Sequence, residues 1–291
     1  MSARPNLPPW LDRELYPFRP RRFETPDGQM SYVDQGEGPV VLLLHGSPGW
    51  SFTWREVITD LSLDHRVIAP DMLGFGLSDV PAADRLRPGD HTRRLAALVA
   101  HLGLREITLV LHDIGGPVGL PLALLAPSPI ARLVVLNSWC WPLGGESGHD
   151  LLRKFLTSRL AEWLYLDADL STRWLMPLAI RDRGRLHRHV HGHYLDALAG
   201  RRRRVGTLAA ARALVTEDRY YAGIWNHRDR LAALPMDIIW GLGDPWLGRR
   251  FLDRWREVFP SALVRELTRC GHFVPEEAPA TIVRTIRGLE S

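Results

Sequence analysis

The fold of this chain is decided by one apolar stretch, residues 107–126, which reads ITLVLHDIGGPVGLPLALLA. Its first five residues are typical of a strand that is buried on both faces, and its last residues fit a buried helix. The stretch is as long as the roughly 20 residues that cross a bilayer. However, the segment 112–117 interrupts it with His and Asp, two glycines and a proline. We therefore predict a strand, a tight turn and a buried helix, and no membrane partner.

Similar apolar runs recur along the chain and alternate with segments of helical spacing. The predicted strands are residues 30–35, 40–44, 66–70, 107–111, 130–136, 237–240 and 263–267. The predicted helices are residues 54–61, 91–102, 118–125, 249–259 and 280–289. This alternation is typical of a mostly parallel sheet covered by helices on both faces. Residues 30–35 alternate polar and apolar side chains, which indicates an antiparallel edge strand.

The middle of the chain has a different pattern. Between residue 138 and about residue 231 no convincing strand is found, and the helical spacing lies in residues 151–166, 171–178, 187–198 and 208–214. We therefore expect a core of residues 1–137 and 232–291, interrupted by a helical cap of residues 138–231. A length of 291 residues suits one large domain with an insertion.

The amino-acid composition indicates where in the cell this protein acts and which kinds of partner it can bind. The first 18 residues lack the apolar segment of a signal peptide, and two cysteines, Cys140 and Cys270, cannot form a disulfide framework. Both observations favour a reducing, cytoplasmic location. The net charge of +4 comes almost wholly from arginine. The run Arg201–Arg204 has no aromatic or binding motif beside it, so we expect a solvated helix end and no nucleic-acid partner.

Chemically useful side chains follow several predicted strands. The carboxyl ends of parallel strands are where such sheets place their functional residues. The segments found there are residues 45–49 (HGSPG), Asp71, residues 112–116 (HDIGG), residues 241–244 (GLGD) and residues 270–273 (CGHF).

Asp113 stands where a nucleophile would stand. A nucleophile elbow of the form Gly-x-Ser-x-Gly needs an exposed side chain on a strained strand-to-helix turn with small neighbours. Gly115 and Gly116 supply the room, and Asp113 takes the place of serine. The alternative is that Asp113 only caps the following helix, because Asp is a favoured N-cap residue.

Two further residues complete the chain order nucleophile, acid and base, namely Asp113, Asp244 and His272. Taken singly, Asp244 is equally typical of a turn before Pro245, and His272 of a surface histidine. Both residues follow predicted strands in the expected order, which favours a catalytic triad.

Six segments together resemble the haloalkane dehalogenases and the related epoxide hydrolases, the group of the α/β-hydrolase superfamily that has an Asp nucleophile. They are residues 45–48 (HGSP), 50–55 (WSFTWR), 70–79 (PDMLGFGLSD), 112–116 (HDIGG), 240–244 (WGLGD) and 271–273 (GHF). The resemblance covers nearly the whole chain, and only the cap matches loosely. It implies an α/β-hydrolase fold, with a mostly parallel central sheet flanked by helices and an inserted helical cap.

The resemblance also implies a mechanism through a covalent ester on Asp113. An ionised carboxylate needs no deprotonation before it attacks an sp³ carbon. His272 would then activate a water that hydrolyses the ester, and Asp244 would orient His272. The backbone N–H groups of Ser47 and Ile114 would form the oxyanion hole. The expected substrate is a small apolar molecule with a carbon–halogen bond, and no cofactor is expected.

The sequence departs from the dehalogenases at two positions that bind halide in that family. The residue after the nucleophile, usually tryptophan, is Ile114, and Ser47 stands where one dehalogenase group has asparagine. Donors for the leaving group would then come from cap aromatics, for each of which packing is the alternative role. The candidates are Trp139, Trp141, Trp174, Tyr220 and Tyr221, with Tyr165 and Tyr194 also in the cap.

Three functions stay open at this point. The first is a dehalogenase-like hydrolase, the second an enzyme of the same group that acts on an epoxide or a strained lactone. The third is a silent binding protein, which is disfavoured because it has no need of an acid–base pair. The histidines at 187, 189, 191 and 193 have the i,i+4 spacing of metal sites but no third ligand at a telling distance, so we predict no metal.

Overall fold

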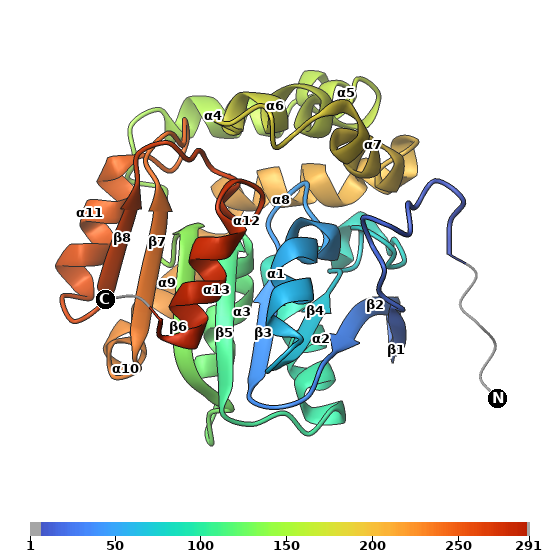
Figure 1. Cartoon of the computed structure of the whole chain (residues 1–291). Coiled ribbons are helices and arrows are strands. Elements are labelled where there is room, and N and C mark those ends of the chain that lie inside the picture. Colours follow the sequence, from blue (N-terminus) through green and yellow to red (C-terminus); the bar gives the residue numbers. More distant parts are fainter. Residues whose placement is uncertain (1–6, 290–291) are drawn as a thin grey trace.

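Eight strands form one central sheet in the computed structural model, which describes residues 7–289 (Figure 1). Their order across the sheet is β1-β2-β4-β3-β5-β6-β7-β8. The strands are β1 (Arg21–Thr25), β2 (Gly28–Gln35), β3 (Val40–Leu44), β4 (Arg66–Pro70), β5 (Ile107–Asp113), β6 (Ile130–Ser138), β7 (Met236–Gly241) and β8 (Leu263–Leu267).

The strands are parallel through most of the sheet and antiparallel at one edge. β1 pairs with β2 and β2 with β4 in antiparallel fashion, and the pairs from β4 through β8 are parallel. The prediction that residues 30–35 form an antiparallel strand is confirmed by β2, but their predicted place at the edge was wrong, because the edge strand is β1. β1 reads RRFET and is largely exposed, so it has no apolar alternation that would reveal it.

Helices cover both faces of the sheet. One face packs against α1 (Arg55–Leu61) and α13 (Pro279–Arg287), and the other against α2 (Pro88–His101), α3 (Gly115–Ala123) and α11 (Arg249–Val258) (Figure 1). Side chains of β3 alternate between the two cores, with Leu42 and Leu44 on one side and Val41 and Leu43 on the other. This confirms the predicted mostly parallel sheet that is buried on both faces.

The segment between Ser138 and Met236 contains no strand and lies largely over the carboxyl ends of the strands (Figure 1). Its helices are α4 (His149–Leu156), α5 (Arg159–Leu166), the π-helix η3 (Leu170–Leu175), α6 (Met176–Ala179), α7 (Arg188–Ala197), η4 (Arg201–Arg204), α8 (Val205–Thr216), α9 (Asp218–Trp225) and α10 (Arg228–Ala232). α9 and α10 contact α3 in the core layer. The remaining short helices of the chain are η1 (Ser51–Trp54), η2 (Ala83–Arg85) and α12 (Val274–Glu277). The cap boundaries of 138 and 231 stay a prediction.

The predicted helix 151–166 is in fact two helices. α4 ends before Thr157, and the Ser158 hydroxyl accepts a hydrogen bond from the N–H of Ala161 at 3.2 Å, so that Ser158 caps α5. The sequence signal for this break was the serine itself, which is a favoured N-cap residue.

Two polar runs of the cap have structural partners. Arg203 donates to the carbonyls of Gly76 and Ser78, and Arg204 to that of Leu166, so the arginine run joins the cap to the core and is not simply a solvated helix end. In the histidine run, the ring of His189 lies 2.7 Å from a carboxylate oxygen of Asp12.

The stretch 107–126 folds as β5 followed by α3, as predicted. Among residues 7–289 no helix has both the length and the apolarity to cross a membrane. Cys140 and Cys270 are both free and buried.

A buried ion pair connects three parts of the fold. Arg55 at the start of α1 donates to both carboxylate oxygens of Glu276 in α12, at 2.5 and 2.8 Å. Tyr194 of α7 also donates to Glu276, and its oxygen lies 3.0 Å from the hydroxyl of Thr53. The side chain of Glu276 is fully buried, so its charge depends on these partners.

We expect Glu276→Gln to destabilise the protein by about 3 kcal/mol, because the buried Arg55 would lose its buried carboxylate partner and keep only the half-exposed Glu56 at 3.6 Å. Glu257→Gln is the matched control, since Glu257 is exposed on α11. Urea unfolding followed by circular dichroism measures both variants. Equal midpoints for the two variants would contradict this role of the buried pair.

Candidate active site

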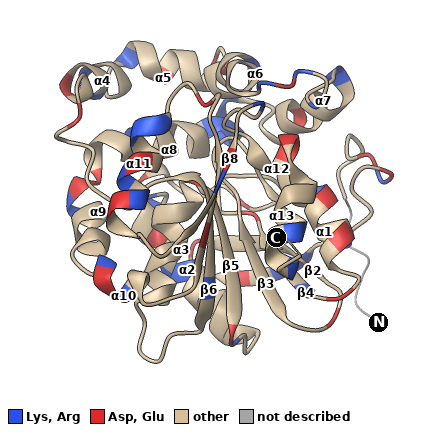
Figure 2. Cartoon of the chain, turned by 60° about the vertical axis from the view of Figure 1, so that its left-hand side comes forward, with Lys and Arg blue, Asp and Glu red and all other residues tan. Residues whose placement is uncertain are grey.

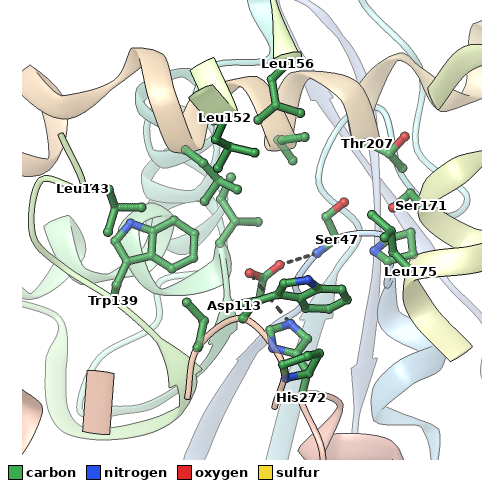
Figure 3. A pocket seen from close by; sticks show the side chains of 18 of the residues that line it. Ser47, Asp113, Trp139, Leu143, Leu152, Leu156, Ser171, Leu175, Thr207 and His272 are labelled. Carbon is green, nitrogen blue, oxygen red and sulfur yellow. Dashed lines mark hydrogen bonds and ion pairs between the residues drawn. The ribbon is translucent and has the colours of Figure 1, made fainter. Parts of the chain in front are cut away.

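A cavity of about 540 Å³ lies between the carboxyl ends of the strands and the cap (Figure 3). The part of its wall from the core includes Ser47, Asp113, Ile114, Trp246, Phe251 and His272, and Trp139 follows directly after β6, where the predicted cap begins. The part from the cap is mainly apolar and includes Leu143, Leu152, Phe155, Leu156, Tyr165, Leu170, Ser171, Leu175, Thr207 and Leu214. Most of the lining is therefore apolar, as is usual in sites for small apolar molecules. One group of polar side chains surrounds Asp113, and a second, which includes Glu146, His149 and Arg250, lies where the segment 143–152 meets α11.

Asp113 stands at the tip of a sharp bend between β5 and α3. Its backbone has a φ of +52°, a left-handed conformation that is costly for a residue with a side chain. Gly116 is required close by, because a Cβ atom there would overlap the hydroxyl of Ser138. α3 begins at Gly115 and no side chain caps it. The alternative in which Asp113 serves as a helix cap is therefore wrong.

The Asp113 carboxylate is held by the core and faces His272. Its Oδ2 accepts a hydrogen bond from the backbone N–H of Ser47 at 2.8 Å, and its Oδ1 lies 3.9 Å from Nε2 of His272. Burial raises the pKa of Asp113, while His272 and the N–H groups of Ser47 and Ile114 act in the opposite direction. The two N–H groups predicted for an oxyanion hole thus both act on this carboxylate.

Asp244 lies after β7 and binds the other side of the imidazole. Nδ1 of His272 is 2.7 Å from Oδ2 of Asp244, and the N–H groups of Trp246 and Leu247 donate to Oδ1. Burial alone would lower the pKa of His272, but the contact with Asp244 outweighs it and raises the pKa above the usual 6.5. Burial would raise the pKa of Asp244, yet His272 and the hydrogen bonds bring it down to about 2. Asp244 is therefore ionised throughout the neutral range.

Sequence reasoning missed two residues that hold this pair. Asn137, near the end of β6, donates to Oδ2 of Asp244 at 2.8 Å and accepts from the N–H of Gly241. His112 approaches the carbonyl of His272 with Nε2 at 2.8 Å, and burial lowers its pKa to about 3, so the neutral ring must donate there. Asn137 belongs to no motif that was singled out, whereas His112 lies in the segment 112–116 that was, but no role was predicted for it.

Most cap candidates for the leaving group do not reach the cavity. Trp174 is 62% exposed, and Trp141 is buried against Phe251 and Trp255. The hydroxyl of Tyr220 donates to the carbonyl of Pro117, and that of Tyr221 to the carbonyl of Ala213. Tyr194 is bound to Glu276. The predictions for Trp141, Trp174, Tyr220 and Tyr221 were therefore wrong, because the sequence does not reveal which side chains of a helix or loop turn toward the cavity.

Trp139 does line the cavity, but its ring nitrogen is badly placed. Nε1 is buried without a hydrogen-bond partner, and in Figure 3 it lies on the side of the ring near Leu143, away from Asp113. The indole therefore presents an apolar edge to the carboxylate in this conformation.

Hydroxyl groups also line the cavity, and among them Ser47 and Tyr165 were named from the sequence whereas Ser171 was not. The hydroxyls of Ser47, Ser171 and Tyr165 line the cavity, and none has a hydrogen-bond partner among residues 7–289. Burial alone raises the pKa of Tyr165 to about 12. Trp246, two residues after Asp244, lies edge-on to His272 with ring centroids 5.6 Å apart. Its position next to a strand-end carboxylate was the signal that could have found it.

Comparison with known proteins places the chain in a family. Residues 39–279 match the family model of the alpha/beta hydrolase fold. Haloalkane dehalogenase 2 of Mycobacterium tuberculosis is 31% identical over 283 residues, which cover 94% of this chain and 96% of that protein. The cis-3-alkyl-4-alkyloxetan-2-one decarboxylase of Shewanella oneidensis is 30% identical over 94% of this chain and 88% of its own length.

A solved structure is also similar to this chain along most of its length. Haloalkane dehalogenase DbeA from Bradyrhizobium elkani superposes with a TM-score of 0.83 at 25% identity, over 93% of this chain and 96% of that one. The chain therefore belongs to the alpha/beta hydrolase fold family and, within it, to the haloalkane dehalogenase-like group of hydrolases.

We expect the imidazole of His272 to titrate above 6.5 in the free protein and Asp244→Asn to lower that pKa, because the neutral amide no longer offsets burial. Histidine-labelled NMR spectra measure the titration, with His272→Gln used to assign the signal. Asp253→Asn, on the exposed side of α11, is the control. A pKa that is unchanged in Asp244→Asn would mean that Asp244 does not stabilise the charged imidazole.

Proposed function

We propose that the chain is a hydrolase that forms a covalent alkyl ester on Asp113 from a small apolar substrate, haloalkanes being the first substrate class. The observation that carries this proposal is the alignment of Ser47 N–H, Asp113, His272 and Asp244 at the floor of an apolar cavity. Membership of the haloalkane dehalogenase-like group supports it. A silent binding protein would gain nothing from a buried, paired acid and base.

In the first step, Oδ1 of Asp113 attacks the sp³ carbon of the substrate and the leaving group departs with the bonding electrons. Oδ2 then becomes the carbonyl oxygen of the ester and stays against the N–H groups of Ser47 and Ile114. A carboxylate needs no general base to remove a proton before it attacks. Burial raises the pKa of Asp113, and His272 with the N–H groups of Ser47 and Ile114 favours the ionised form against it.

In the second step, His272 takes a proton from a water that attacks Cγ of Asp113. The separation of 3.9 Å between Nε2 and Oδ1 is too long for a good hydrogen bond and leaves the carboxyl group open to a water held by Nε2. Negative charge develops on Oδ2, which the two N–H groups stabilise. The bond from Cγ to Oδ1 then breaks, His272 returns the proton, and the alcohol leaves with Oδ1.

We expect His272→Phe to stop after the first step and to accumulate protein that carries the alkyl group. Intact-protein mass spectrometry after incubation with a 1-bromoalkane measures the added mass, and digestion should place it on Asp113. Asp113→Asn in the same background should carry no added mass. An unmodified His272→Phe protein, with a wild type that still releases bromide, would rule out the ester.

A second candidate function is the opening of a strained oxygen ring, such as an oxetan-2-one. The specific observation in its favour is Ile114, which offers no side-chain donor to a departing halide beside Asp113. The relatives that are oxetan-2-one decarboxylases match this chain as well as the dehalogenases do, at 30–32% identity. A ring oxygen that stays tethered to the product can use the hydroxyls of Ser47, Ser171 or Tyr165.

We expect 1-bromoalkanes to react at least about tenfold faster than 1-chloroalkanes. Chloride is the poorer leaving group and depends more on a hydrogen-bond donor, and the loss of such a hydrogen bond to a charged group costs roughly 1.5–3 kcal/mol. Halide release under matched conditions measures the ratio. Loss of a cis-3,4-dialkyl oxetan-2-one, followed by gas chromatography, is the parallel assay. If the oxetan-2-one reacts and neither halide does, the second candidate replaces the first.

A further inference from the structure

The outer surface of the cap carries large apolar side chains that no part of residues 7–289 covers. Trp163 is 55% exposed, Trp174 62% and Leu151 74%. We call this set the cap patch; it consists of Leu151, Leu152, Leu160, Trp163, Trp174 and Leu178. The other exposed large apolar side chains, such as Leu63 and Leu263, lie apart from one another in the core.

The residues of the cap patch lie on neighbouring helices. Leu160 and Trp163 are three residues apart on α5, and Trp174 and Leu178 are four apart along η3 and α6, so each pair shares a face. α5 contacts both α4 and η3. In Figures 1 and 2 the helices α4, α5 and α6 form the side of the molecule farthest from the sheet.

The opposite face of the same helices is already buried. Leu156 of α4 and Tyr165 and Leu166 of α5 pack against α8 in a small core of their own. A surface helix of a globular protein usually has one apolar face, and α5 has two. Packing within the cap therefore does not explain why Leu160 and Trp163 are apolar, because both side chains lie on the exposed face of α5.

The charges around the cap patch are mainly positive. Arg153, Lys154 and Arg159 are exposed and have no carboxylate within 4.0 Å among residues 7–289. Most of the carboxylates on the same helices are paired with other arginines. Glu162 is paired with Arg201 and Arg212, Asp167 is paired with Arg201, and Asp169 is buried near Arg173 and Arg204; Asp150 is the remaining one.

The cap patch also borders the mouth of the cavity. Leu152 is 42% exposed and lines the cavity, while Leu151 beside it is on the outer surface. Trp246, on the core side, is likewise exposed and lines the cavity. An apolar phase that meets the cap patch would therefore lie next to the entrance.

We propose that the cap patch docks on an anionic lipid surface, with Trp163 and Trp174 at the level of the headgroups. Tryptophan and leucine flanked by Lys and Arg are the composition of segments that lie in a membrane interface. A second copy of this chain fits less well, because a two-fold interface would bring the unpaired cations of one protomer against those of the other. Docking does not depend on the chemistry proposed for Asp113.

We expect the full-length protein to sediment with vesicles of phosphatidylcholine and phosphatidylglycerol and not with phosphatidylcholine alone, and the bound fraction to fall as salt rises. Trp163→Ser with Trp174→Ser should weaken binding at least about tenfold, because two interfacial anchors are lost. Leu63→Ser with Leu263→Ser is the matched control, since it removes two exposed apolar side chains from the core surface and should bind as wild type does.

A charge series tests the cations separately. Replacement of Arg153, Lys154 and Arg159 by Gln should weaken binding to the anionic vesicles on the order of 100-fold. The matched triple variant, Arg19, Arg105 and Arg219 to Gln, removes the same charge elsewhere and should bind as wild type does. The proposal is overturned if wild type stays in solution with both vesicles, or if control and test variants lose binding equally. It is also overturned if light scattering shows a dimer that only the Trp163 and Trp174 variant dissociates.

Discussion

The left-handed backbone at Asp113 is the constraint on which the rest of the site depends. A φ of +52° at a residue with a side chain costs about 1–3 kcal/mol, and surrounding contacts must offset this cost. The Ser138 hydroxyl donates to the carbonyl of Asp113 at 2.6 Å, and the N–H of Ser47 fixes the carboxylate. Gly115 and Gly116 let the start of α3 approach β3 and β6 closely. The bend therefore exists only because three strands meet there.

The remaining geometry of the candidate site depends on strand ends that the parallel sheet brings together. β5 carries Asp113, β6 carries Asn137, and Asp244 and His272 follow β7 and β8. Because β5, β6, β7 and β8 are neighbours, groups up to 159 positions apart in the chain share one cavity floor. The cap contributes to the same floor, since the N–H of His272 donates to the carbonyl of Ala179 at 2.8 Å. Movement of the cap would therefore change the position of the His272 imidazole.

The cap has two surfaces with different physical roles. Its inner surface is an apolar roof with a few unpaired hydroxyls, which suits an uncharged substrate with one polar group. Its outer surface combines exposed tryptophans with unpaired cations. Trp174 illustrates the difference, because the sequence suggested a leaving-group donor and the structure turns the ring outward. A single cap thus accounts both for the shape of the cavity and for the proposed docking.

The sequence by itself determined the strands β3, β4 and β8 residue for residue and the parallel sheet. It also predicted Asp113, Asp244 and His272 as a triad, and the structure brings these three side chains together. It could do so because buried parallel strands are continuous apolar runs, and their carboxyl ends necessarily lie on one edge. Only the tertiary structure decided that Trp139 and Trp246 line the cavity while Trp141, Trp174, Tyr220 and Tyr221 do not. It also supplied Asn137, His112, the exposed strand β1 and the cap patch. The physical reason is that the direction of a side chain depends on tertiary packing. Successive residues of a helix point about 100° apart, so the packing of neighbouring helices decides which of them face the cavity. Trp139, Trp141 and Trp246 lie in loops, whose course short stretches of sequence do not fix.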